Sequence, residues 1–368
     1  MPSGKTSRDL RLKMRKALFI IALLNLYALV ADAHSVTNDS VIAESVVAKQ
    51  NLLTKLDKKL TTGYFKSKYD SGYVVRPAEK WLLKLSDNLS GTSIHAKGTV
   101  NDVWSKYGLY STLNNNISLE ADYCDIAVAA SINPSKIRGT YDDYELNFEY
   151  HGNQISLDLN YQRSTSLEGD IDLGPVKRLE KDALYMKTFT LTGYYIFNHR
   201  HFSFPAAFYQ NYIQLRSAGS WLAGLTFQSG CIRTTDELIE RSPSAPDVHI
   251  DAAHVGIGGG YGYNFVFGKH SQWLFHLSML PTVVVYNHNE LTVRSAADRA
   301  AGKEAETHGA KHMRFNMVFN ERAALVYHFS EKCFAGATLM MSNSIFDDKA
   351  VVINQNKGIA RAFVGIRL

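Results

Sequence analysis

The feature that most constrains this chain is a two-residue period in hydropathy. Between Arg314 and Ser330 the odd positions are mostly apolar or aromatic, while the even positions include Asn316, Asn320 and Arg322. Successive side chains of a β-strand point to opposite faces, so the pattern predicts a strand with one apolar face. The segment is long enough to cross a bilayer, which takes about 9–11 tilted residues. Glu321 interrupts the apolar face, so either it lies beyond the hydrocarbon or a β-bulge shifts the register.

The same alternation recurs elsewhere. In Gln154–Gln162, the residues Asp158, Asn160 and Gln162 form a polar face opposite an apolar one. Similar segments lie at 144–151, 188–197, 220–228, 253–267, 272–286, 333–342 and 359–368. Short links alternate with longer polar loops at 164–185, 229–251 and 288–312, as in transmembrane barrels. The connections at 164–185 and at Asn198–His201 do not fit a C-terminal strand that ends in the periplasm.

The pattern predicts an all-β fold, an antiparallel transmembrane β-barrel of about 12–14 strands with a short N-terminal helical segment. No stretch after the first 33 residues is apolar enough for a membrane-spanning helix. A soluble β-sandwich is the rival fold. It would seldom need such long strands or so many outward aromatic residues, and this chain has 20 Tyr and 18 Phe.

The N-terminus predicts export. Six basic residues precede the apolar run Ala17–Val30, which Ala31-Asp32-Ala33 follows, as in a secretory signal peptide cleaved after Ala33. Residues 34–62 repeat apolar positions at helical spacing, which predicts an amphipathic helix or a loosely folded periplasmic tail. We therefore divide the chain into a signal peptide (1–33), a partly helical periplasmic segment (34–75) and a barrel (76–368).

Charge and cysteines exclude other classes of protein. The whole chain carries +5, but residues 1–33 account for +4, so the exported part is close to neutral and shows no nucleic-acid footprint. Cys124, Cys231 and Cys333 are far apart and odd in number, so we expect no disulfide scaffold and three structurally incidental thiols.

The histidines and glycines do not form a known catalytic or metal motif. His308 and His312 have helical metal spacing, but Gly309 replaces the glutamate of H-E-x-x-H. Gly256, Gly258, Gly260 and Gly262 share one strand face, which favours local packing over a ligand groove. No G-x-S-x-G elbow is present, although a Ser/His catalytic set in the lumen, as in barrel lipases, stays open. We expect no catalytic, cofactor or metal site.

Arginines near the C-terminus are candidates for the barrel interior. Arg314, Arg322, Arg361 and Arg367 either pair with lumen carboxylates or form an anion-favouring constriction. The polar faces together predict a lumen-lining set, which comprises Asp158, Asn160, Gln162, Arg314, Asn316, Asn320 and Arg322.

Two blocks carry a family resemblance. Tyr195–Gln210, with the central run Asn198-His-Arg-His-Phe-Ser-Phe-Pro-Ala-Ala-Phe208, is followed by Gln214–Ser220, which contains Ser217-Ala-Gly-Ser. Together they resemble an uncharacterised family of Bacteroidetes outer-membrane barrel proteins, domain of unknown function 4421. Leu157–Gln162, Tyr73-Val74 and Trp81 also fit, and the resemblance spans about residues 68–368. Pro205 and the terminal Leu368 depart from the family pattern.

The resemblance implies a fold and an outer-membrane location, and no activity. The hypotheses are a pore for small solutes, a closed structural or partner-binding barrel that acts through its loops, and third an enzyme. We expect contact with outer-membrane lipid and with the barrel assembly machinery. Envelope proteins are further possible partners, which the sequence does not identify. We expect no nucleic acid and no cofactor.

Overall fold

The computed structural model describes residues 54, 55, 58, 68–100, 103–123, 126–134, 143–172, 176–309, 316–348 and 351–368. The strands are β1 (Val74–Val75), β2 (Trp81–Val100), β3 (Val103–Tyr110), β4 (Asn114–Tyr123), β5 (Ile126–Ile132), β6 (Tyr144–His151), β7 (Ile155–Ser164), β8 (Glu168–Asp172), β9 (Val176–Leu179), β10 (Leu184–Ile196), β11 (Ile213–Gln214), β12 (Ala218–Thr234), β13 (Asp247–Phe267), β14 (Trp273–Arg294), β15 (Glu306–Gly309), β16 (Met317–His328), β17 (Cys333–Asp348) and β18 (Val351–Arg367). The described helices are α4 (Phe204–Phe208), α5 (Asp236–Arg241) and α6 (Ala296–Ala300).

One antiparallel sheet dominates the described residues. Its path runs β6-β7-β10-β12-β13-β14-β16-β17-β18-β2-β3-β8-β9, and it holds sixteen strands when β4, β5 and β15 are included. The all-β, antiparallel prediction is therefore confirmed. The count exceeds 12–14 because short strands accompany long ones: β3 and β4 pair with successive parts of β2 as one interrupted strand.

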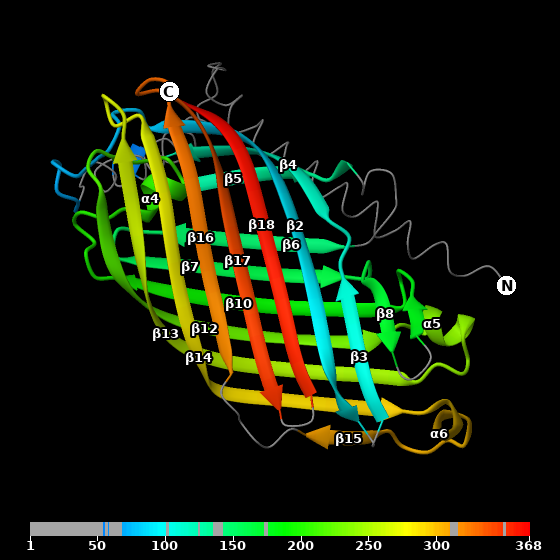
Figure 1. Cartoon of the computed structure of the whole chain (residues 1–368). Coiled ribbons are helices and arrows are strands. Elements are labelled where there is room, and N and C mark those ends of the chain that lie inside the picture. Colours follow the sequence, from blue (N-terminus) through cyan, green and yellow to red (C-terminus); the bar gives the residue numbers. More distant parts are fainter. Residues whose placement is uncertain are drawn as a thin grey trace, which may run out of the picture. The chain divides into compact units, whose positions relative to one another are not determined.

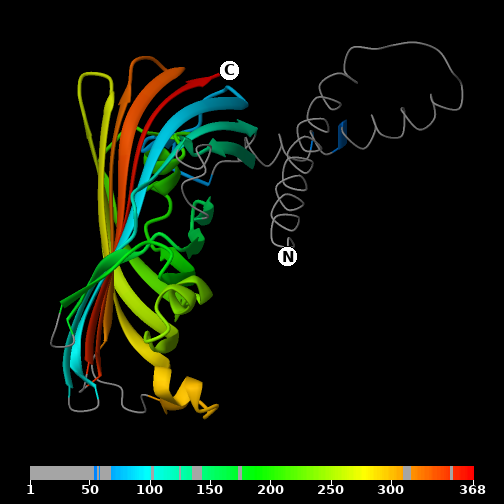
Figure 2. The same ribbon diagram turned by 90° about the vertical axis from the view of Figure 1, so that its right-hand side faces the viewer.

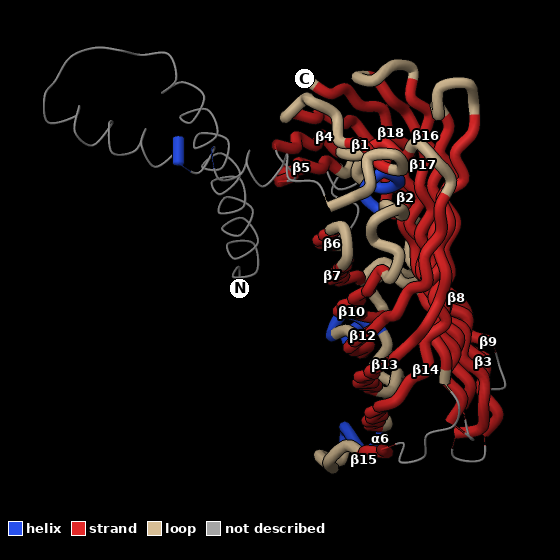
Figure 3. Tube along the Cα trace, turned by 90° about the vertical axis from the view of Figure 1, so that its left-hand side faces the viewer, coloured by secondary structure: helices blue, strands red, loops and turns tan. Residues whose placement is uncertain are grey.

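The sheet curls over on itself. Figure 1 shows β16, β17, β18 and β2 crossing in front of β7, β10, β12 and β13 at a steep angle. The orange and red strands form one wall when they are seen edge-on in Figure 2, and Figure 3 shows the two walls facing each other. Between these walls lies the interior toward which the buried side chains point.

Side chains link β2 to the strands β6 and β7 at one end of the sheet. Among the described residues, β5 pairs only with β4 and β6 only with β7, so a fully hydrogen-bonded ring is not found there. Instead, Ser90 on β2 donates a hydrogen bond to Glu145 on β6 at 2.9 Å, and Thr92 donates to Gln162 on β7 at 3.4 Å. These contacts connect β2, which pairs with β18, to the strands β6 and β7 at the other end of the strand order.

The predicted alternation sets the two faces of the strands. On β16 the even residues from Val318 to His328 point inward and most are buried, whereas Leu325 on the odd face is exposed. The ladders on both sides of Glu321 run without a register shift, so the bulge alternative is wrong. A shift occurs between Val255 and Gly256 instead.

Aromatic side chains gather on the outward face at the end of the sheet where the C-terminus lies. Ring contacts link Trp81 with Tyr123, Trp221 with Tyr261, and Trp273 with both Phe267 and Tyr327. Apolar residues such as Leu225, Ile257 and Leu277 lie outward further along the strands. The outward face thus has an apolar band bordered by an aromatic row.

The strands extend further than their hydropathy indicates. The loops predicted at 229–251 and 288–312 are shorter in the structure. β12 reaches Thr234, β13 begins at Asp247 and β14 reaches Arg294, so parts of both predicted loops belong to strands. The outward faces of these extensions carry polar residues such as His249 and Asp251, so the apolar outward face that marks the rest of each strand ends there. β10 and β18 run in the same direction, so Asn198–His201 lies at the same end as the C-terminus, and both doubtful connections fit the topology.

Most of the N-terminal segment lies outside the described residues, including the predicted signal peptide 1–33 and nearly all of the predicted helix in 34–62. Residues 54, 55 and 58 are helical and belong to a unit that is separate from the rest of the described chain. No described helix has both the length and the hydropathy needed to span a membrane.

Candidate functional site

A folded segment fills one end of the interior. We call residues 198–217, with α4 and β11, the plug. β11 pairs with β1, and Phe202, Phe204 and Phe208 are almost completely buried. These rings pack in one cluster with inward side chains of the surrounding strands, which are Leu82, Leu222, Leu274, Leu280, Val326, Phe334 and Phe363.

The plug begins with a capped helix. The Ser203 hydroxyl accepts a hydrogen bond from the Ala206 amide, and Pro205 stands in the first turn, where its missing N–H costs nothing. Sequence reasoning read Asn198–His201 as a turn between strands. The plug was missed because its apolar residues cluster without the period of a strand or a long helix.

Polar side chains attach the plug to the barrel wall. Asn264 on β13 donates from Nδ2 to Gln214 Oε1 and to the Ser203 carbonyl, both at 2.9 Å. Gln214 in turn donates to the carbonyls of His201 at 2.6 Å and Arg216 at 3.0 Å. These side chains are buried, so their polar atoms exchange water for protein partners.

Asn264 also orients a histidine. Its Oδ1 lies 2.7 Å from His276 Nδ1, and His276 Nε2 lies 2.9 Å from Ser278 Oγ. An amide oxygen only accepts, so Nδ1 carries the proton, and a neutral ring then accepts at Nε2 from Ser278. The order Ser–His–Asn is that of a nucleophile, a base and an orienting group. The rings of Phe202, Phe204 and Phe208 cover His276.

Arg367 on the C-terminal strand β18 contacts the end of the plug. It is 2% exposed, and its Nε and Nη2 donate to the Gln210 carbonyl at 3.0 and 2.6 Å, while Nη1 donates to the Glu331 carbonyl at 2.5 Å. Gln210 has φ of +62°, an uncommon left-handed conformation for a residue other than glycine. The bonds from Arg367 help to hold this backbone conformation.

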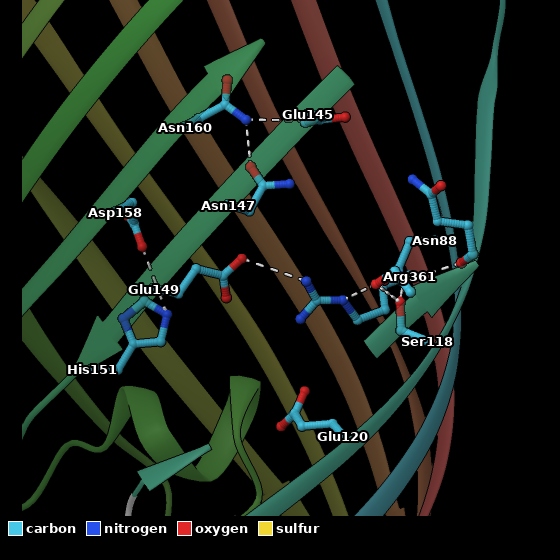
Figure 4. A network of polar contacts seen from close by, with 12 residues as sticks. Asn88, Ser118, Glu120, Glu145, Asn147, Glu149, His151, Asp158, Asn160 and Arg361 are labelled. Carbon is cyan, nitrogen blue, oxygen red and sulfur yellow. Dashed lines mark hydrogen bonds and ion pairs between the residues drawn. The ribbon is translucent and has the colours of Figure 1, made fainter. Parts of the chain in front are cut away.

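Ion pairs cross the interior beyond the plug (Figure 4). Arg361 on β18 pairs with Glu149 on β6, with 3.4 Å between Nη2 and Oε1, and donates from Nε to Asn88 Oδ1 at 2.6 Å. Arg322 on β16 pairs with Asp158 on β7. Each pair connects opposite walls, so protein side chains bridge the interior at these two points.

Further polar contacts link strands around the interior. Lys357 on β18 lies 3.5 Å from Glu145 Oε1, and Glu145 also accepts from Asn160 at 3.0 Å. Gln228 on β12 donates to Gln355 on β18 at 3.3 Å. Lys84, although 1% exposed, is paired with Glu120 at 2.8 Å. Lys84 and Lys357 therefore both have carboxylate partners, as burial of charge requires.

The structure brings much of the predicted lumen set together. Asp158, Asn160, Gln162 and Arg322 face the interior and take part in the contacts above, and Asn316 is 1% exposed. Asn320 shares the inward face of β16 with Arg322, whereas Arg314 lies outside the described residues. That these residues line an open path is still a prediction.

Sequence reasoning missed the partner residues Glu145, Glu149 and Lys357. The carboxylates alternate with apolar residues on β6, and that alternation is the signal that could have found them. Of the two alternatives for the arginines, pairing with carboxylates is the one seen for Arg322 and Arg361. Arg367 donates hydrogen bonds to the backbone carbonyls of Gln210 and Glu331.

The glycine face serves close packing. A Cβ on Gly260 would lie 2.1 Å from the Met279 carbonyl oxygen, and one on Gly262 would lie 3.0 Å from the ring of Phe202 in the plug. The face therefore lets β14 and the plug approach β13, as expected from local packing.

Outside the interior, one set of side chains could hold a metal ion. Cys231, His249 and Asp251 offer donor atoms within 4.8 Å of one another. Sequence spacing did not reveal them, because the cysteine and the other two residues lie on different strands. Cys231 and Cys333 are free thiols, and Cys124 lies outside the described residues.

Comparisons with solved structures give weak similarities. The outer membrane protease OmpT from Escherichia coli has a TM-score of 0.40 and 8% identity, over 81% of this chain and 100% of that chain. The outer membrane protein OprG from Pseudomonas aeruginosa has a TM-score of 0.31 and 7% identity, over 80% and 99%. Similarities of this size carry no information about activity.

A third similarity, to Ail, the attachment invasion locus protein of Yersinia pestis, has a TM-score of 0.26 and 9% identity, over 76% of this chain and 97% of that chain. No curated protein matches the sequence. Residues 68–367, which include the plug, match the family described as domain of unknown function DUF4421. Because this match covers most of the chain, the protein belongs to the DUF4421 family.

Proposed function

We propose that this protein is an integral outer-membrane β-barrel with a filled interior, which acts through its surfaces and not as a channel. The filled interior carries the proposal: the plug occupies one end, and ion pairs such as Arg361–Glu149 join opposite walls beyond it. This arrangement favours the closed, partner-binding hypothesis over a pore, because barrels of modest size can be filled by their own side chains.

The outward face supports the membrane location. It carries an apolar band, and Trp81, Trp221 and Trp273 lie near the starts of β2, β12 and β14, at the end of the sheet where Trp81 pairs with Leu368. Aromatic girdles at the membrane–water interface are a regular feature of outer-membrane barrels. The proposal includes export by the signal peptide at 1–33, insertion by the barrel assembly machinery, contact with outer-membrane lipid, and no catalytic activity.

The test is conductance of the purified full chain in a planar bilayer. We expect no discrete conductance steps from inserted protein, with insertion established by resistance of the strands to protease and by heat-modifiable migration in gels. Stable discrete steps would refute the filled interior. In that case the charge reversal Arg322→Glu should alter ion selectivity, since Arg322 would then belong to the pore lining.

One observation favours a second candidate, a hydrolase. Ser278, His276 and Asn264 have the hydrogen-bond order of a nucleophilic catalytic set. Ser278 is 5% exposed and lies behind the plug, so a substrate would reach it only after the plug moves. Labelling with a fluorophosphonate separates the two functions: labelling that Ser278→Ala abolishes supports the hydrolase, whereas absence of labelling supports the structural role of the set.

A further inference from the structure

The outward face of β12 changes from apolar to polar along the strand. From Trp221 to Phe227 its outward residues are mostly apolar, and Ser229, Cys231 and Arg233 follow. The neighbouring β13 undergoes the same change. A polar outward patch therefore begins where the apolar band ends, close to α5 in Figure 1.

Three side chains with metal-binding chemistry meet in this patch. Cys231 lies directly opposite Asp251 in the β12–β13 ladder, and His249 is two residues from Asp251 on β13. Residues that are opposite, or two apart on one strand, project to the same face of a sheet. The sulfur, a ring nitrogen and a carboxylate oxygen thus converge on one point outside the barrel.

The distances suit a tetrahedral ion after a small adjustment. The three donor atoms lie within 4.8 Å of one another, and His249 Nε2 is 3.1 Å from Asp251 Oδ2. Zinc holds sulfur, nitrogen and oxygen ligands at about 2.0–2.3 Å, which places tetrahedral ligands about 3.3–3.8 Å apart. Side-chain rotations that move the donors by about 1 Å would complete that geometry.

The neighbouring cations are directed away from the three donors. Lys187 faces Cys231 from β10, but its Nζ lies over the ring of Tyr161 on β7 at 5.8 Å. The guanidinium of Arg233 lies over the ring of Tyr185 on β10 at 4.6 Å. Both cations are thus drawn to the β10 side of Cys231, which leaves its β13 side to His249 and Asp251.

An unfavourable charge pair adds an independent reason for a cation. Asp251 lies directly opposite Glu290 in the β13–β14 ladder, so two carboxylates project from neighbouring positions of one face. Like charges directly opposite destabilise a sheet. His288 contacts Glu290 at 3.7 Å and compensates it only when the imidazole is protonated. A divalent ion beside Asp251 would relieve the repulsion without a protonated imidazole.

We propose that Cys231, His249 and Asp251 bind Zn²⁺ on the outward face of the barrel. Thiolate, imidazole and carboxylate together are a ligand set that favours zinc over calcium or magnesium. Three protein ligands leave a fourth position for water or for a donor from a partner. The proposed zinc site does not depend on whether the barrel interior conducts ions. Its test is therefore separate from the conductance test of the filled barrel.

The test uses the full chain with Cys124→Ser and Cys333→Ser, which keeps Cys231 as its thiol, and Co²⁺ as a spectroscopic probe. We expect one equivalent of Co²⁺ to give a thiolate-to-metal charge-transfer band, which Zn²⁺ then removes by displacement. Cys231→Ser should abolish the band. His249→Ala should weaken binding by more than about 100-fold, because even outer-shell partners of a metal contribute about 10–100-fold.

Matched controls lie in the same protein. His288→Ala changes an outward histidine of the same patch and should leave Co²⁺ binding unchanged. Zn²⁺ should protect Cys231 from alkylation by iodoacetamide, while Cys333 in a C124S/C231S chain reacts equally with and without Zn²⁺. Absence of the charge-transfer band, an affinity that His249→Ala does not change, or equal protection of Cys333 would overturn the proposal.

Discussion

Arg361 on β18 reaches across the interior to Glu149 on β6, with 3.4 Å between the guanidinium and the carboxylate. Both side chains are largely buried, so each charge depends on the other for compensation. Glu149→Ala should lower the free energy of unfolding by about 3 kcal/mol, because it leaves Arg361 buried without its carboxylate. Urea unfolding in phospholipid vesicles, followed by tryptophan fluorescence, measures the change.

A double-mutant cycle separates this pair from general damage to the strands. The variant Glu149→Ala/Arg361→Ala should be more stable than the sum of the two single changes predicts, since no isolated charge is left behind. Strict additivity would show that the two residues do not interact in the folded protein.

The plug rings should contribute strongly to stability. Phe204 is 1% exposed and contacts Phe202, Phe208 and His276. Phe204→Ala should cost about 3–5 kcal/mol in the same unfolding assay, because it creates a cavity inside the cluster. Phe329→Ala is the control, since Phe329 is 63% exposed and its removal leaves no cavity, so it should cost much less than Phe204→Ala. Equal effects of the two changes would contradict a packed plug.

The period of two was enough to assign faces to the long strands. It put Asp158 and Arg322 on polar strand faces, and both residues lie on the inward side of their strands in the structure, since side-chain direction in a strand needs no knowledge of partners. It could not pair them, because they are 164 residues apart and the register between distant strands depends on the whole sheet. The sequence therefore predicted that inward arginines pair with carboxylates, but it did not predict which carboxylate pairs with which arginine.

The plug and the outward metal set escaped sequence analysis for different reasons. Phe202, Phe204 and Phe208 pack around a single helical turn, which is too short to show a period. Cys231, His249 and Asp251 meet only through the β12–β13 ladder, whose register sequence spacing does not reveal. The strand ends near Thr234 and Arg294 were underestimated, because outside the apolar band neither face needs to be apolar.

Close packing against β14 should make Gly260 sensitive to substitution. A Cβ there would lie 2.1 Å from the carbonyl oxygen of Met279, which backbone geometry does not allow. Gly260→Ala should therefore lower the unfolding free energy by about 1–3 kcal/mol through local strain. Gly358→Ala is matched in size, and no atom lies within 4 Å of its added Cβ. A neutral Gly260→Ala would contradict the approach of β14 to β13.

The hydroxyl of Tyr209 at the end of α4 is buried and has no hydrogen-bond partner among the described residues. Tyr209→Phe should leave stability at neutral pH unchanged or slightly higher, because it removes an unsatisfied polar group. Tyr194→Phe is the contrasting change, since its hydroxyl accepts from Arg322 at 2.9 Å. Loss of that charge-assisted bond should cost about 1.5–3 kcal/mol. The order of the two variants in urea unfolding checks this assignment.

Tyr209 also predicts a difference in alkali. Burial, followed by the nearby carboxylate of Glu149, raises the pKa of its phenol well above the ordinary value of 10.0. The unfolded chain ionises at its ordinary pKa while the folded protein keeps the proton, so ionisation of Tyr209 leaves stability unchanged below about pH 10 and lowers it progressively above that pH. Wild-type protein should therefore lose more stability between about pH 8 and about pH 11 than Tyr209→Phe does. Urea midpoints at the two pH values measure the difference, and identical losses would mean that the phenol is accessible to solvent in the folded barrel.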